Sequence, residues 1–231
     1  MPDSANPLMI PYGRQSINED DERMVLDCLR SDYLTQGPYV EKFENALSSL
    51  TGSSYVTAFN SATSALHASC LALGLGPGDW LWTSPISFVA SANCGLYCGA
   101  KVDFVDIDPA TGLISLSSLE SKLKIAELRG VLPKLLVVVH LAGTSCHMER
   151  LAALACLYGF KLLEDASHSI GGRYQGQPIG SCAFSSITVF SFHPVKIMTT
   201  GEGGVTCTND CAIASKIQRI RSHGIVRSDF E

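Results

Sequence analysis

A single lysine stands in a segment whose other residues are mostly small or apolar. The segment runs from Ser191 to Gly204, reads SFHPVKIMTTGEGG, and has no acidic residue within three positions of Lys196. Burial would lower the pKa of this amine from its usual value of about 10.4. A neutral lysine amine can form a Schiff base with an aldehyde. A lysine in a loop is more often an exposed residue, but these flanking residues favour the chemical interpretation.

A second segment could bind a phosphate group. The residues Asn60-Ser61-Ala62-Thr63-Ser64 follow a predicted strand and open a predicted helix. The free backbone N–H groups and the positive dipole end of such a helix attract anions. Ser191 could add a hydroxyl ligand to the same phosphate. Taken alone, a serine or threonine at a helix start is more often a simple N-cap.

A third segment combines a carboxylate with an imidazole at the end of an apolar strand. It reads Glu164-Asp165-Ala166-Ser167-His168. Asp165 could hold a protonated heterocyclic nitrogen, and His168 could reach the same ring. The alternative is a capping aspartate beside a solvated histidine. Phe88 could stack on that ring, although an aromatic residue at a helix start is normally part of the core.

Together these segments supply what pyridoxal 5'-phosphate (PLP) requires of a protein. They offer a phosphate site, an aromatic residue for the ring face, an acid for the ring nitrogen and a lysine for the aldehyde. The combination is more specific than any of its parts. A dinucleotide-dependent oxidoreductase is the main alternative, but it needs a G-x-G-x-x-G loop where Asn60–Ser64 stands.

Alternating strands and helices are expected to position these residues. Strands are predicted over Tyr55–Phe59, Trp80–Thr83, Lys101–Ile107, Leu135–His140, Phe160–Leu163, Ser186–Phe192 and Val205–Thr208. Helices are predicted over Ala62–Leu73, Phe88–Cys98, Ser117–Ile125, Met148–Leu157 and from Asp210 to His223. Repeated βα units with buried strands indicate a three-layer α/β/α domain with a mostly parallel sheet. Ligands bind beyond the carboxyl ends of such strands, so the loops that follow them should meet in one site.

The first 50 residues follow a different pattern. Asn18 is expected to cap a helix over Glu19–Arg30, and Tyr39–Leu50 should form a second helix. We therefore predict an N-terminal arm with helices over residues 1–50 and a large cofactor-binding domain over residues 51–231.

The composition excludes several other functions. The chain has 231 residues, of which 46% are hydrophobic and 17% charged, so it should be globular. A net charge of -5 argues against a nucleic-acid partner. No apolar run approaches the roughly 18 residues of a membrane span, and no signal peptide is apparent. Nine cysteines without a C-x-x-C pair indicate reduced thiols of a cytoplasmic protein and no metal site.

The motifs resemble those of the sugar-nucleotide aminotransferases of the DegT/DnrJ/EryC1/StrS family, a branch of the fold-type I PLP enzymes. The resemblance covers nearly the whole chain. It rests on Leu34–Pro38, Phe59–Leu66, Ser84–Ala90, Glu164–His168 and Ser191–Gly204. It implies that residues 51–231 form the three-layer large domain of that fold, and that the family's C-terminal small domain is missing.

The resemblance also implies a role for each matching residue. Lys196 would bind the cofactor aldehyde and act as the catalytic base. Asp165 would pair with the pyridine nitrogen, His168 would lie near the ring hydroxyl, and Phe88 would cover the ring face. The phosphate would be held by Ala62, Thr63 and Ser191. Contacts to the sugar nucleotide would come from Tyr12 and from the turn formed by Asp32, Tyr33, Leu34 and Thr35.

Within the family, Thr83–Asn93 and Arg221–Gly224 are most similar to the branch that acts in pseudaminic acid biosynthesis. This implies transfer of an amino group from L-glutamate to C4 of a UDP-linked 4-keto-6-deoxy-N-acetylhexosamine. Another keto sugar or a cyclitol remains an alternative. The 3-dehydratases of the family carry histidine in place of Lys196, so that chemistry is not expected. The family dimer shares its active sites, so we expect a homodimer, with an inactive or partner-dependent fragment as the alternative.

Overall fold

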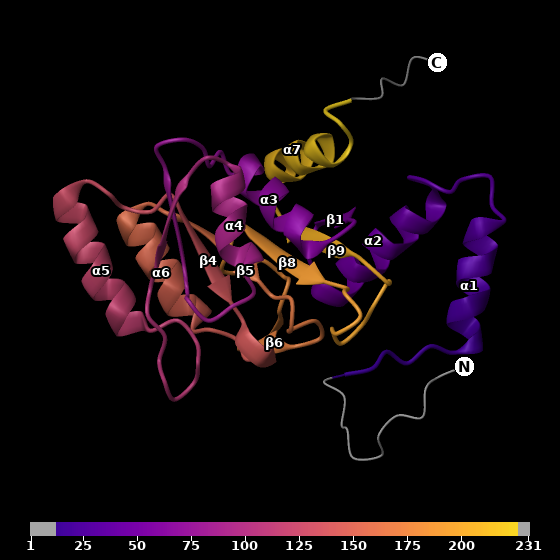
Figure 1. Ribbon diagram of the computed structural model, residues 1–231, viewed down its shortest axis with the longest axis horizontal. Coiled ribbons are helices and arrows are strands. Elements are labelled where there is room, and N and C mark those ends of the chain that lie inside the picture. Colours follow the sequence, from indigo (N-terminus) through magenta and orange to yellow (C-terminus); the bar gives the residue numbers. More distant parts are fainter. Residues whose placement is uncertain (1–12, 226–231) are drawn as a thin grey trace, which may run out of the picture.

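Helices cover both faces of one central sheet (Figure 1). The computed structural model describes residues 13–225. The sheet has seven strands in the order β1-β9-β8-β5-β4-β2-β3. Their bounds are β1 Tyr55–Phe59, β2 Trp80–Thr83, β3 Lys101–Phe104, β4 Leu135–Val139, β5 Lys161–Asp165, β8 Ile187–Ser191 and β9 Gly204–Thr208. A small separate hairpin joins β6 Arg173–Tyr174 to β7 Gln177–Pro178.

The direction of the strands brings the predicted loops to one edge. β3, β2, β4, β5 and β8 are parallel neighbours, while β9 is antiparallel to both β8 and β1. β1 therefore points the same way as β8, and only β9 is reversed. The mostly parallel α/β sheet predicted from the sequence is confirmed. The carboxyl ends of β1, β2, β4, β5 and β8 lie at the same edge, where ligands bind in such sheets.

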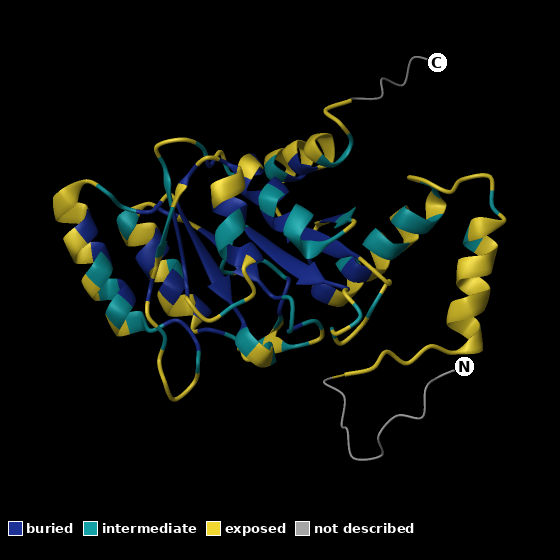
Figure 2. Ribbon diagram, viewed as in Figure 1, coloured by how far each residue is buried: buried dark blue, intermediate teal, exposed yellow. Residues whose placement is uncertain are grey.

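Alternate residues of the central strands bury opposite faces. Leu135 and Val137 of β4 pack beneath α3 Ala62–Ala72 and α4 Ala90–Tyr97. Leu136 and Val138 pack on the other side, against α5 Leu116–Arg129 and α6 Met148–Tyr158. All five residues of β4 are buried, as expected of a strand covered on both faces. Figure 2 shows this buried sheet between the helices.

Several predicted boundaries need correction. The helix predicted from Phe88 begins at Ala90, so Phe88 lies in the preceding loop. The strand predicted over Lys101–Ile107 ends at Phe104, because its partner β2 has only four residues, and Ile107 forms an isolated bridge with Ile114 instead. The helix predicted over Ser117–Ile125 is longer than expected, spanning Leu116–Arg129.

The two N-terminal helices differ in how they meet the domain. α2 Pro38–Thr51 buries Leu47 beside β1, and its Phe43 contacts Phe192 edge to face with ring centroids 5.3 Å apart. α1 Glu19–Leu29 has a capping box at Asn18 but no buried residue, and it stands away from the sheet in Figures 1 and 2. The proposed division at residue 50 stays a prediction. α7 Cys211–Arg221 begins after the Asp210 cap, as expected.

The nine cysteines all lie in the described part of the chain, and none forms a disulfide. Five of them are buried: Cys70, Cys94, Cys98, Cys146 and Cys207. Within residues 13–225 no cluster of histidine, cysteine and acidic residues has the arrangement of a metal site. No helix in the same range combines the length and apolarity needed to cross a bilayer.

Candidate active site

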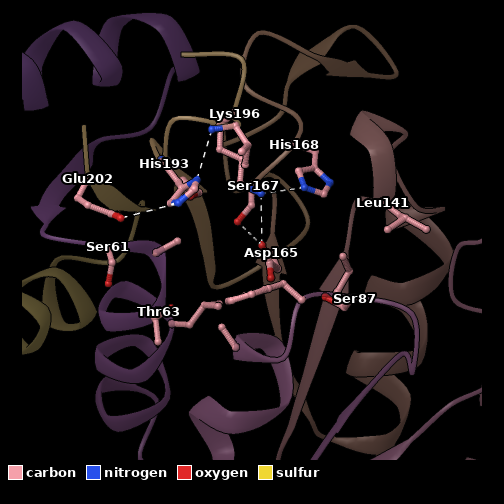
Figure 3. A pocket seen from close by; sticks show the side chains of 17 residues that line it. Ser61, Thr63, Ser87, Leu141, Asp165, Ser167, His168, His193, Lys196 and Glu202 are labelled. Atoms are coloured by element: carbon pink, nitrogen blue, oxygen red, sulfur yellow. Dashed lines mark hydrogen bonds and ion pairs between the residues drawn. The ribbon is translucent and has the colours of Figure 1, made fainter. Parts of the chain in front are cut away.

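The predicted loops surround one cavity at the carboxyl edge of the sheet. Its volume is about 350 Å³, within the range of small-molecule pockets. Figure 3 shows side chains that line this space, and they come from the segments after β1, β2, β4, β5 and β8. The structure brings together these residues from the sequence prediction: Ala62, Thr63, Phe88, Asp165, His168, Ser191 and Lys196.

Lys196 lies beside His168 at the mouth of the cavity. Lys196 follows β8 in the loop to β9, and His168 follows β5. Lys196 Nζ is 2.9 Å from His168 Nε2, and the backbone N–H of Ala142 donates to His168 Nδ1 at 3.3 Å. An imidazole whose Nδ1 accepts a hydrogen bond carries its proton on Nε2 when neutral. In that tautomer the Nε2–H of His168 faces Lys196 Nζ and can donate to the amine when Lys196 is neutral.

The environment lowers the pKa of both side chains. Burial lowers the pKa of Lys196 below its usual 10.5, and the carboxylate of Asp165 opposes part of this effect. The pKa of His168 is also lowered, by burial and by the charge of Lys196 against the raising influence of Asp165. A lysine with a lowered pKa is available as a nucleophile nearer to neutral pH.

Asp165 ends β5 as a buried carboxylate held by two hydroxyl groups. Ser91 Oγ donates to its Oδ2 at 2.6 Å, and Ser167 Oγ donates to its Oδ1 at 2.6 Å. Only 5% of Asp165 is exposed. Within residues 13–225 no lysine, arginine or histidine forms an ion pair with it. A buried carboxyl group without a cationic partner among these residues can pair with a cationic ring nitrogen.

The opposite end of the cavity has the features of a phosphate site. α3 begins at Ala62 after the Ser61 cap, and its first backbone N–H groups have no partner within the helix. Gly204 lies so close that a Cβ there would come within 2.4 Å of the Ala62 nitrogen. Glycine therefore allows β9 to pass against the helix start. Ser191, at the end of β8, lines the same cavity.

Phe88 lies at the rim rather than in the core. Its side chain is 71% exposed although it lines the cavity. The loop from Ser84 to Val89 carries it between β2 and α4. An aromatic side chain at this position can stack on a ring bound in the cavity.

The sequence analysis did not identify a buried ionic pair behind the site. His140 Nε2 lies 2.7 Å from Glu164 Oε2, with His140 0% and Glu164 5% exposed. Glu164 Oε1 accepts further bonds from Ser185 and from Thr188 at 3.1 Å. Buried carboxylates are uncommon without partners, so Glu164 at the end of an apolar strand was a signal that such a partner exists.

The predicted sugar-nucleotide residues do not line this cavity within the single chain. Asp32, Tyr33 and Leu34 are exposed in the segment before α2. Thr35 lines a separate cavity beside β1 and α3. Tyr12 lies outside the described residues. Their role stays a prediction.

The residues that line the cavity fit PLP, both at its phosphate group and at its pyridine ring. The start of α3, with Gly204 against it, provides a cradle for the phosphate. Asp165 provides a buried carboxyl group that forms no ion pair within residues 13–225 and suits the ring nitrogen, and Lys196 provides an amine for the aldehyde. This donor set on a mostly parallel sheet defines the class of PLP-binding α/β domains.

Known proteins support this class. The profile of the DegT/DnrJ/EryC1/StrS aminotransferase family matches residues 15–231. The UDP-4-amino-4,6-dideoxy-N-acetyl-beta-L-altrosamine transaminase of Campylobacter jejuni is 41% identical over 220 residues, which are 95% of this chain and 56% of that protein. The chain therefore belongs to the DegT/DnrJ/EryC1/StrS aminotransferase family, whose cofactor is PLP.

Solved structures agree with the fold. PseC of Helicobacter pylori, an aminotransferase of pseudaminic acid biosynthesis, superposes with a TM-score of 0.87 at 36% identity, covering 95% of this chain and 57% of that one. Spr1654 of Streptococcus pneumoniae in its PLP form gives 0.80 at 29% identity, covering 91% and 57%. The chain spans a little more than half the length of these relatives.

Proposed function

We propose that this chain carries the cofactor-binding half of a PLP-dependent aminotransferase acting on a nucleotide-linked keto sugar. The observation that carries the proposal is the convergence of Lys196, His168 and Asp165 on one cavity whose other end can hold a phosphate. The 41% identity to a sugar-nucleotide transaminase supports the substrate class.

The chain's own residues have separable tasks in this reaction. Asp165, whose carboxyl oxygens accept hydrogen bonds from two hydroxyl groups, would pair with the ring nitrogen and keep a proton on it. When bound, the protonated cofactor withdraws electrons from the carbon that carries the amino group. Lys196 would hold the aldehyde of the cofactor, and its free amine would move a proton at that carbon.

His168 orients the amine of Lys196. The 2.9 Å contact places the amine at the cavity, and the Ala142 N–H fixes the imidazole tautomer that donates to it. Phe88, exposed at the rim, would cover the ring face and exclude water from it.

For the substrates we propose L-glutamate as amino donor and a UDP-linked 4-keto-6-deoxy-N-acetylhexosamine, aminated at C4, as acceptor. The support is the transaminase from C. jejuni and the structural similarity to PseC. A cytoplasmic location belongs to this proposal, since five cysteines are buried as free thiols.

The test is transamination in two halves. The PLP-loaded chain with L-glutamate alone should yield one equivalent of 2-oxoglutarate, and the keto sugar should then give the 4-amino sugar with turnover. Lys196→Ala should abolish both halves, while Lys124→Ala, on the exposed side of α5, should not. Failure of the first half contradicts the aminotransferase proposal; failure of the second alone contradicts the choice of sugar.

We further propose a homodimer in which one copy completes the site of the other. The support is that Asp32, Tyr33 and Leu34 are exposed and lie away from their own chain's cavity. Sedimentation equilibrium should give twice the monomer mass. A monomer that turns over the keto sugar would contradict the shared site.

A further inference from the structure

A chain of serine hydroxyl groups connects Asp165 to the loop that carries Phe88. Ser91 Oγ lies 2.6 Å from Asp165 Oδ2, and Ser87 Oγ lies 2.7 Å from Ser91 Oγ. The backbone N–H of Ser91 also donates to the carbonyl of Phe88 at 3.2 Å. Ser91 is thus bonded both to the acid and to the loop bearing the aromatic residue.

The hydrogen bond of Ser91 differs from those of other buried helical hydroxyl groups in this protein. Ser69 in α3 donates to the carbonyl of Ala65 at 2.7 Å, and Thr51 in α2 donates to that of Leu47 at 2.8 Å. Donation one turn back along the helix is the usual choice for a serine that has no tertiary partner. Ser91 is also buried, with 0% exposed, but its hydroxyl does not donate one turn back along the helix. It donates to Asp165, the last residue of β5.

Ser91 is not a cap of its helix either. The N-cap of α4 is Val89, which makes no side-chain capping bond. Nor does Ser91 line the cavity, whereas Ser87 and Asp165 do. Its hydroxyl can therefore act on a bound ring only through its two partners that line the cavity, Asp165 and Ser87.

We propose that Ser91 is a positioning residue that fixes the Asp165 carboxylate for the ring nitrogen of the cofactor, with Ser87 linking it to the Phe88 loop. The proposal rests on the proposed PLP site. Ser91 holds Oδ2 and Ser167 holds Oδ1, so both oxygens are fixed before the ring arrives. A carboxylate fixed in advance loses less conformational freedom on binding, which favours affinity.

The experiment compares PLP with its 1-deaza analogue, in which a C–H group replaces the ring nitrogen. Ser91→Ala should weaken binding of PLP about tenfold, the effect of one hydrogen bond to a charged group. Because the analogue has no nitrogen for Asp165, its affinity should change less than about twofold, the scatter expected for a substitution away from the contact. Ser69→Ala, equally buried in α3, is the matched control and should leave both affinities unchanged.

The outcomes separate this proposal from the proposed function. If the unaltered chain does not bind PLP, the cofactor site itself is wrong. If it binds PLP and Ser91→Ala weakens PLP and the analogue equally, the serine has only a structural role. If Ser91→Ala changes neither affinity, Asp165 does not depend on Ser91. Either of the last two results overturns the proposal, and circular dichroism of the variant shows whether α4 is still folded.

Discussion

Lys196 and Asp165 share one cavity, and the charge of the carboxylate alters the chemistry of the amine. Burial lowers the pKa of Lys196, while Asp165 raises it. Asp165→Asn removes the opposing charge, so the pKa of Lys196 should fall further. The pH profile of Lys196 labelling by an amine-reactive reagent, read by mass spectrometry of the cofactor-free chain, should shift to lower pH. Lys124 serves as the internal reference, and an upward shift would contradict the assignment.

His140 and Glu164 form a second pair whose role is stability. Both are buried, and their nitrogen and oxygen are 2.7 Å apart. His140→Leu leaves the Glu164 carboxylate with hydroxyl partners only, and breaking a buried pair in this way costs about 3–5 kcal/mol. Urea unfolding should show this loss. The double variant with Glu164→Leu should recover part of it, because no buried charge remains; strictly additive losses would speak against the pair.

At the scale of elements, the contact between β9 and the start of α3 shapes the end of the cavity that would hold the phosphate. Gly204→Ala would bring a Cβ within 2.4 Å of the Ala62 nitrogen, so the strand or the helix start must move. We expect a stability loss of about 1–3 kcal/mol, as for an overpacked core. PLP affinity should fall as well. Gly76→Ala is the control because its Cβ would meet nothing within 4 Å. Equal stability and equal PLP affinity of the two variants would contradict the proposed phosphate cradle.

Local sequence patterns predicted most of these elements. Tyr55–Phe59 and Trp80–Thr83 coincide with β1 and β2 because dense β-branched and aromatic residues are bounded by turn residues. The rest depends on distant partners. β3 ends where its partner β2 ends. β9 lies antiparallel between β1 and β8, and its pairing with β1 joins segments more than 100 residues apart. Ser91 could not be found because nothing local distinguishes it from other helical serines.

The location of the candidate site could be predicted from the sequence because the carboxyl ends of parallel strands lie at one edge of a sheet. That rule brought Ala62, Lys196 and Asp165 together without knowledge of their contacts. The 2.9 Å contact of Lys196 with His168 and the His140–Glu164 pair required the folded chain, since each joins segments more than 20 residues apart.

For the molecule as a whole, the 231 residues hold the lysine, the acid and one phosphate cradle on a single sheet. The central claim is that these groups bind PLP through Lys196. The chain should be incubated with PLP, reduced with borohydride, digested and analysed by mass spectrometry. We predict one pyridoxyl group, on Lys196, and none at this site in Lys196→Ala. Modification spread over surface lysines, with Lys196 unlabelled, would contradict it.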